Sequence, residues 1–163
     1  MKVAILMGSE SDFDVAKGAL EIFKKFGVKY AVEVTSAHRS PERTVDLVKT
    51  YEEKGVELFI TLAGKAAHLG GVVAAHTVRP VIGVPVGGSA LAGMDSLFST
   101  VQMPQGIPVA CMGIGKSGAA NAALLAVEIL ALKDDELTKM LREYRKLMAA
   151  QVERSSNNIK RIL

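Results

Sequence analysis

Short apolar runs alternate with longer segments of helical periodicity over the first two-thirds of the chain. The apolar runs have the length of buried strands and occupy residues 3–7, 28–35, 56–63, 81–86 and 107–112. Helical spacing of apolar residues is found at residues 12–26, 41–55, 66–76, 95–102 and 118–132, and a more polar helix is expected from residue 134 onward. Because strands that are apolar throughout need cover on both faces, the alternation predicts a parallel sheet between layers of helices.

The length and composition fit one globular domain. The chain has 163 residues, of which 49% are hydrophobic and 23% charged, and we find neither an internal repeat nor a linker. We therefore expect a single domain over residues 1–163, an α/β three-layer αβα sandwich with a five-stranded parallel sheet of the flavodoxin-like kind. Residues 1–132 would form the α/β core and residues 133–163 a C-terminal helical arm.

The C-terminal helix has an apolar stripe that leaves two interpretations open. Its approximate heptad spacing is carried by Leu137, Leu141, Tyr144, Met148, Ser155, Ile159 and Ile162, with Val152 one place off. The stripe packs either on its own domain or, as an intersubunit arm, on another copy of the chain. Residues 119–132 are apolar nearly all round, which calls for burial on more than one side and favours an oligomer.

Charge, aromatic content and cysteine usage exclude several classes of function. The net charge is only +3, aromatics make up 5% and Trp is absent, so we expect no nucleic-acid partner. The longest apolar stretch, residues 119–132, is too short to span a bilayer, and no membrane partner is expected. The single cysteine, Cys111, excludes an intramolecular disulfide and fits a soluble, cytoplasmic protein. The histidines are not clustered as metal ligands, so no metal is expected.

Four segments with unusual composition follow the expected strands, at the edge of a parallel sheet where ligands bind. They are residues 8–12, 36–41, 63–71 and 87–108. The first joins a glycine and two serines to a helix start, which suits a phosphate, and the second offers Arg39 for the same group. His38 and His68 could each carry a proton near neutral pH. The ordinary alternatives are helix capping by Ser11 or Asp12, a solvated turn, close helix–strand packing and a plain connecting loop. The residues thus indicate a small α/β domain that binds a phosphorylated small molecule and transfers protons.

Several short motifs follow one another along the chain. They are Met7-Gly8-Ser9-Glu10-Ser11-Asp12, Ser36-Ala37-His38-Arg39-Ser40-Pro41, Ala66-Ala67-His68-Leu69, Pro80-Val81-Ile82-Gly83-Val84-Pro85-Val86, Asp95-Ser96-Leu97, Val101-Gln102-Met103-Pro104, Gly106-Ile107-Pro108-Val109 and Asn121-Ala122-Ala123-Leu124-Leu125-Ala126. Together, in this order, these motifs resemble the PurE family. Bacterial-type members are N5-carboxyaminoimidazole ribonucleotide mutases of de novo purine (IMP) biosynthesis, isomerases that move a carboxylate from the exocyclic nitrogen to ring carbon C4. The resemblance implies no cofactor, no metal, a ribonucleotide substrate and a homooctamer with active sites shared between subunits.

The resemblance also implies roles for individual residues. The candidate catalytic residues are His38 and His68, and the candidate substrate-binding residues are Ser9, Asp12, Ser36, Arg39, Gly64, Lys65 and Leu69. In this assignment His38 is the general acid–base and His68 lines the site beside it. Ser9 and Arg39 would face the phosphate and Asp12 the ribose, while Gly64 would present backbone to the carboxylate.

Two features bear on the class of enzyme within that family. Arg39 and His68 favour the mutase over members that carboxylate aminoimidazole ribonucleotide directly with CO2. Lys65 and Gly70 depart from the family's usual Gly and Pro, so that Lys65 either adds a charge at the carboxylate site or points to solvent, and Gly70 loosens the His68 turn. The alternatives are the direct carboxylase and a nucleotide-binding module without catalysis.

Overall fold

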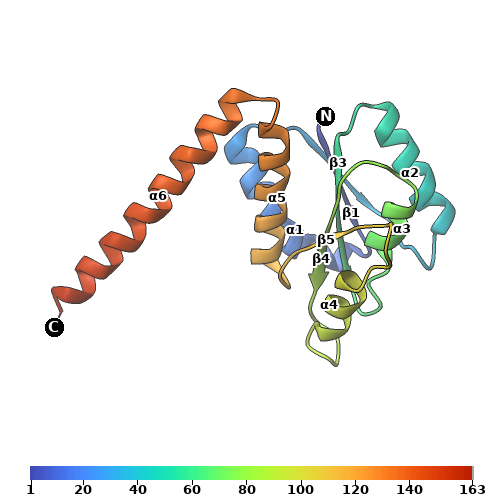
Figure 1. Cartoon of the computed structure of the whole chain (residues 1–163). Coiled ribbons are helices and arrows are strands. Elements are labelled where there is room, and N and C mark those ends of the chain that lie inside the picture. Colours follow the sequence, from blue (N-terminus) through green and yellow to red (C-terminus); the bar gives the residue numbers. More distant parts are fainter. Residues whose placement is uncertain (163) are drawn as a thin grey trace. The chain divides into compact units, whose positions relative to one another are not determined.

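A parallel five-stranded sheet forms the core of residues 1–126 in a computed structural model, which describes residues 1–162 (Figure 1). Its strands are β1 (Val3–Met7), β2 (Tyr30–Val34), β3 (Leu58–Gly64), β4 (Val81–Val86) and β5 (Ala110–Cys111). They lie in the order β2-β1-β3-β4-β5, and every neighbouring pair is parallel. This is the flavodoxin-like order, so the expected fold class is confirmed.

Six α-helices follow or connect the strands. They are α1 (Phe13–Phe26), preceded by a 3-10 turn at Glu10–Asp12, α2 (Pro41–Glu53), α3 (Leu69–Ala75), α4 (Met94–Val101), α5 (Lys116–Ala131) and α6 (Asp135–Lys160). α1 ends at Gly27, whose φ of 67° lets the backbone leave the helix in a left-handed conformation. α2 begins with Pro41, which is tolerated in a first turn because its missing N–H has no helical partner there.

The described chain divides into two compact units, Met1–Ala126 and Val127–Leu163. The first unit contains the whole sheet, α1 to α4 and the beginning of α5. The second contains the end of α5 and the whole of α6, and no residue of α6 (Asp135–Lys160) is buried. The expected single domain, with its core over residues 1–132 and its arm over 133–163, stays a prediction.

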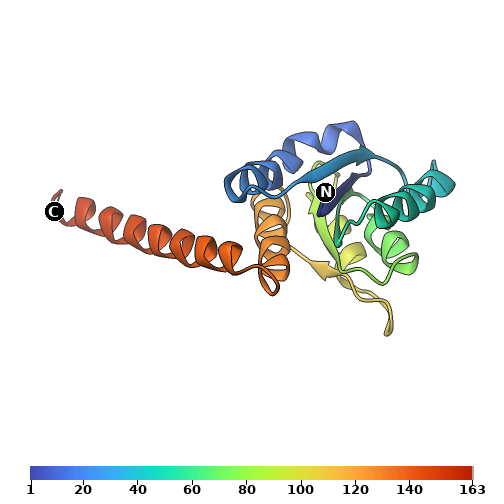
Figure 2. The same ribbon diagram turned by 90° about the horizontal axis from the view of Figure 1, so that it is seen from above.

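Helices cover both faces of the sheet in the first unit (Figure 2), and successive side chains of a strand point to opposite faces. Ala4, Leu6 and Phe59 belong to a buried cluster with residues of α2 and α3. The neighbouring Val3 and Ile5 are also fully buried and face the other layer. That layer contains α1 and the beginning of α5, which approach so closely that a Cβ on Gly18 would lie 2.3 Å from the Lys116 carbonyl oxygen.

The bounds of β1 and β4 match those expected, the bounds of most other segments differ by one or two residues, and two segments differ by more. The last strand is only Ala110–Cys111 instead of residues 107–112, since Pro108 has no N–H to donate to a ladder. α3 begins at Leu69 rather than at residue 66, because Lys65 has a φ of 57° and the next residues form a tight turn. Among the helices within residues 1–162, none is both long and apolar enough to cross a membrane.

Candidate active site

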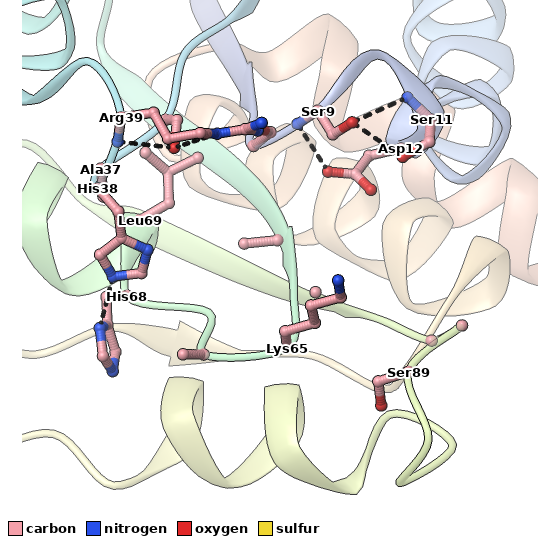
Figure 3. Close-up of a pocket in the computed structure, with 17 residues that line it drawn as sticks. Ser9, Ser11, Asp12, Ala37, His38, Arg39, Lys65, His68, Leu69 and Ser89 are labelled. Carbon is pink, nitrogen blue, oxygen red and sulfur yellow. Dashed lines mark hydrogen bonds between the residues drawn. The ribbon is translucent and has the colours of Figure 1, made fainter.

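The loops that follow β1, β2, β3 and β4 enclose one pocket of about 670 Å³ at the carboxyl edge of the sheet (Figure 3). Its lining residues are Gly8, Ser9, Ser11, Asp12, Ser36, Ala37, His38, Arg39, Ala63, Gly64, Lys65, Ala66, His68, Leu69, Gly87, Gly88 and Ser89. The first and third strands are neighbours although they are not consecutive, so the chain leaves in opposite directions on the two sides of their contact. That arrangement opens a crevice in which ligands bind in folds of this kind.

The turn after β1 is held by its own polar side chains. Ser9 Oγ accepts hydrogen bonds from the Ser11 N–H at 3.3 Å and the Ser11 hydroxyl at 2.9 Å. Asp12 Oδ2 accepts one from the Ser9 N–H at 3.0 Å, which completes a capping box. Ser9 therefore caps the 3-10 turn with its side chain, whereas Asp12 occupies the N-cap position of α1 without a side-chain capping bond to that helix.

Asp12 is a buried carboxyl group at the wall of this pocket. Only 6% of the residue is exposed. Burial raises the pKa of Asp12 above its ordinary value, and hydrogen bonds from Ser9 and Ser11 oppose that shift. A carboxylate kept in such a place costs folding free energy, which is a feature of residues retained for binding or catalysis.

The turn after β2 presents Arg39 to the pocket. Ser36 Oγ accepts hydrogen bonds from the Arg39 N–H at 3.2 Å and from Arg39 Nε at 3.5 Å. The Arg39 guanidinium also donates to the Gly8 carbonyl oxygen at 3.4 Å. Arg39 therefore ties the second loop to the first and keeps a positive charge beside the Ser9–Asp12 turn.

Buried hydroxyl groups beneath the pocket surface hold the turn after β2 in place. Thr35 and Thr44 are 2% and 0% exposed, and their hydroxyl oxygens are 2.8 Å apart. Ser40 Oγ accepts from the Ser36 N–H at 3.0 Å, and the Thr44 hydroxyl donates to the Ser40 carbonyl oxygen at 3.2 Å. The sequence analysis did not predict a role for the two threonines. The available signal was that Thr35 follows a strand end and Thr44 lies in the first turn of a helix.

His38 and His68 meet in the pocket from two different loops. His38 Nε2 lies 2.8 Å from His68 Nδ1, and the ring planes are nearly perpendicular, at 82°. Both residues are exposed to the pocket, and His68 lies on the side of His38 away from Asp12 (Figure 3). The pair provides an acid–base group next to a cationic, hydroxyl-rich region.

The opposite wall is built from small residues and backbone. A Cβ on Gly64 would lie 3.3 Å from the Val86 carbonyl oxygen, so any side chain there would crowd β4. Lys65 is exposed and lines the pocket in a left-handed conformation. Ser89 lies in the fourth of the segments singled out in the sequence, residues 87–108, and its hydroxyl donates to Asp95 Oδ1 at 2.8 Å.

All nine candidate site residues line this one pocket. They are His38, His68, Ser9, Asp12, Ser36, Arg39, Gly64, Lys65 and Leu69. Of the fourth segment, residues 87–108, only Gly87, Gly88 and Ser89 line the pocket. Across residues 1–162 no three His, Cys, Asp or Glu side chains come together as a metal site would require. Two cationic side chains against one carboxyl group suit a small anionic ligand, while the individual roles stay predictions.

Comparison with known proteins gives consistent relatives over most of the chain. Three of these relatives are described here, and each is named "N5-carboxyaminoimidazole ribonucleotide mutase". The Escherichia coli K12 protein is 52% identical over 151 residues, 93% of this chain and 89% of its own. The Pyrococcus abyssi protein is 54% identical over 147 residues, 90% and 83% of the two chains. The Thermotoga maritima protein is 47% identical over 161 residues, 99% and 93%.

A solved structure and a family model agree with those relatives. The crystal structure of Treponema denticola PurE has a TM-score of 0.88 to this chain, with 34% identity, and the match covers 97% of this chain and 98% of that one. The model of the AIR carboxylase family matches residues 2–151. The chain therefore belongs to the AIR carboxylase family, the PurE family that its motifs resemble.

Proposed function

We propose that this chain is an N5-carboxyaminoimidazole ribonucleotide mutase, an isomerase of de novo purine biosynthesis. The observation that carries the proposal is the pocket in which the His38–His68 pair lies beside Arg39 at the edge of the sheet. The relatives named for this activity, 47–54% identical to the chain, support it.

The proposed binding mode follows from the charges and hydroxyl groups of the lining. The substrate phosphate lies between Ser9 and Arg39, whose guanidinium already faces Gly8. Asp12 accepts a hydrogen bond from a ribose hydroxyl, and Ser36 adds a contact on the same side. Gly64, Lys65 and Leu69 surround the carboxylate on the opposite side, where the Lys65 ammonium offsets its charge.

The reaction needs one proton given and one proton taken. The bond between the exocyclic nitrogen and the carboxyl carbon breaks, its electron pair stays on nitrogen, and nitrogen takes a proton as CO2 is released. Ring carbon C4 then attacks the trapped CO2 to form a carbon–carbon bond and loses its own proton. His38 gives the first proton and takes the second, a contribution of about 10²–10⁴-fold in rate. The Gly87–Ser89 segment limits the escape of CO2, which is a positioning effect.

The deciding experiment compares two reactions run in parallel. Conversion of N5-carboxyaminoimidazole ribonucleotide in bicarbonate-depleted buffer, faster than its spontaneous breakdown, is the expected result. Product from aminoimidazole ribonucleotide only with excess bicarbonate would instead make the chain a direct carboxylase, the reading that the family's own description favours. Tight ribonucleotide binding without product in either reaction would leave a binding module.

His38→Asn tests the residue to which the proton transfers are assigned. We expect turnover to fall by about 10²–10⁴-fold with ribonucleotide affinity retained, since the amide keeps the size of the side chain but cannot carry the proton. Near wild-type turnover in this variant would contradict the role of His38.

The proposal includes a cytoplasmic homooctamer in which α6, within residues 133–163, packs on another subunit. Several apolar residues of α6 are exposed, among them Leu147 at 52%, Val152 at 71% and Ile159 at 60%. Light scattering of the full chain should give the mass of eight subunits, and a chain lacking residues 134–163 a lower mass. An unchanged mass would mean that this helix covers only its own subunit.

A further inference from the structure

The contact between His38 and His68 restricts how many protons the two rings can hold. His38 Nε2 and His68 Nδ1 are 2.8 Å apart, a distance at which one hydrogen lies between two nitrogens. A second hydrogen between the same atoms would place two donors against each other. While the rings are in contact, the pair therefore holds one shared hydrogen, and the remaining proton chemistry occurs at the two outer nitrogens, His38 Nδ1 and His68 Nε2.

Counting hydrogens gives the states that are open to the pair. A neutral imidazole has one N–H, so the neutral pair has two hydrogens, one shared and one on an outer nitrogen. Uptake of one proton fills the second outer nitrogen and makes one imidazolium. Uptake of another is excluded, because both inner nitrogens would then have to donate. Two histidines in this contact are one acid–base unit with a capacity of a single proton.

We infer that His68 is a positioning residue for His38: its Nδ1 accepts the His38 Nε2–H, and His38 Nδ1 is thereby fixed as the atom that exchanges protons with substrate. This inference rests on the proposed function and deepens it. The partner of one ring nitrogen decides which tautomer a histidine adopts. The 2.8 Å contact allows either nitrogen to donate. The assignment follows from the role proposed for His38, because only a donating Nε2–H leaves Nδ1 bare to take a proton from C4. With Nε2–H held by His68, His38 Nδ1 is bare in the neutral pair and protonated in the charged pair.

The assigned states match the order of the reaction. The charged pair gives the Nδ1 proton to the exocyclic nitrogen as the nitrogen–carbon bond breaks, and becomes neutral. His38 Nδ1 then takes the proton that C4 loses after it has bonded to CO2. The shared hydrogen stays between the rings throughout, so the cycle ends with the pair charged as it began and no proton is exchanged with water.

Other charged groups face the same pocket and must be kept constant in any test. They are Asp12 from the turn after β1, Arg39 beside His38 and Lys65 before α3. The third histidine of the chain, His76, is exposed and is absent from the pocket lining, so it supplies an internal reference in every spectrum.

The first readout is spectroscopic and does not depend on turnover. In ¹⁵N-histidine-labelled wild type, long-range ¹H–¹⁵N spectra should show His38 with hydrogen on Nε2 and a bare Nδ1. The number of hydrogens on the four ring nitrogens should show that the pair takes up one proton in all. In His68→Leu, His38 should become a mixture of tautomers. Uptake of two protons by the pair, or an unchanged His38 tautomer in His68→Leu, would overturn the inference.

The second readout compares two substitutions of His68. Asn can accept the His38 Nε2–H through its amide oxygen, whereas Leu cannot. We expect His68→Asn to keep kcat within about threefold and His68→Leu to lose about ten- to hundredfold in kcat, with KM little changed in both. Equal losses of kcat in the two variants would mean that His68 itself exchanges a proton with substrate. An unchanged kcat in His68→Leu would mean that the contact does not contribute to catalysis. If wild type forms no product, the proposed function fails, and the tautomer measurement still decides the contact.

Discussion

The two sides of the pocket are held in place by different means. On one side, Ser9, Asp12, Ser36 and Arg39 hold their turns through side-chain hydrogen bonds before any ligand arrives. On the other side, the Lys65 turn closes through backbone bonds, Ala67 N–H to Lys65 O at 2.9 Å and His68 N–H to Ala66 O at 2.8 Å. The first side therefore offers polar side chains in fixed positions, and the second offers backbone shaped by small residues.

This difference separates two jobs that the proposed reaction requires. A phosphate and a ribose do not change during the reaction, so a rigid set of charges and hydroxyl groups can bind them without the entropy cost of ordering side chains. The carboxylate leaves one atom and joins another, and its surroundings must accommodate both positions. A wall of backbone and short side chains leaves room for that movement. Substitutions at three positions test the comparison, taken here from the largest expected effect to the smallest.

Asp12→Asn should give the largest effect, on the polar side. Replacing a charged acceptor of a ribose hydroxyl by a neutral one should raise KM by about tenfold or more with kcat little changed, since a charged hydrogen bond contributes about 1.5–3 kcal/mol. Steady-state kinetics measure this. Asp14→Asn is the matched control, because Asp14 lies next to this turn on the surface and pairs with Lys17. An equal rise of KM in the control would point to net charge rather than to a contact.

The same substitution has a pH signature in stability. Burial raises the pKa of Asp12, so the folded chain holds the carboxyl proton more tightly than the unfolded chain. Its stabilising contribution is full below the unfolded pKa of about 3.9 and is lost as the pH rises through the higher folded value. Denaturation between about pH 3 and 6 should thus show the wild type losing unfolding free energy relative to Asp12→Asn. The opposite slope would contradict the direction of the shift.

Thr44→Val tests whether the buried hydroxyl groups hold the His38 turn. The substitution keeps the shape of the side chain and removes its bonds to Thr35 and Ser40. We expect a loss of about 1–3 kcal/mol in unfolding free energy, from a buried hydroxyl without its partner, and about tenfold in kcat from a looser turn. Chemical denaturation and kinetics measure the two effects.

Thr44→Ser separates the hydroxyl from the methyl group. Serine keeps both hydrogen bonds and leaves only a methyl-sized gap, so kcat should stay near the wild-type value while stability falls by about 1 kcal/mol. If Ser and Val lower kcat equally, packing rather than hydrogen bonding positions His38.

The polar side was also the more predictable one from sequence. Ser9, Asp12 and Arg39 stand directly after strands whose apolar runs mark their ends, and β1 and β4 have the expected bounds. Parallel topology then brings the strand ends to one edge, so the common location of the site residues could be predicted. The pattern of apolar residues carries that much information because burial on both faces of the sheet dictates it.

Backbone conformation and contacts between distant loops could not be predicted in the same way. The left-handed φ of Lys65 delays α3 to Leu69, although the Ala-rich sequence favours an earlier start. The 2.8 Å contact of His38 with His68 joins residues 30 positions apart, and it depends on the shape of two turns that no periodicity specifies. The hydrogen bond between Thr35 and Thr44 could not be predicted either, because serine and threonine are common in turns without any such role.

Lys65→Gly should give the smallest effect, and one of opposite sign. A side chain in the left-handed region costs about 1–2 kcal/mol. Glycine avoids that cost but loses about 0.5–1 kcal/mol more than alanine in backbone entropy on folding. The free energy of unfolding should therefore rise by about 0.5–1 kcal/mol. Lys65→Ala removes the same ammonium but keeps the Cβ, and it should bring no gain. Both should raise KM by a few-fold if the ammonium offsets the substrate carboxylate. An equal gain of stability in Lys65→Ala would show that the cost lies in repulsion between Lys65 and Arg39 rather than in the backbone. The stability of the Lys65 turn would then depend on charged side chains, as that of the polar side does, and the contrast between the two sides would fail.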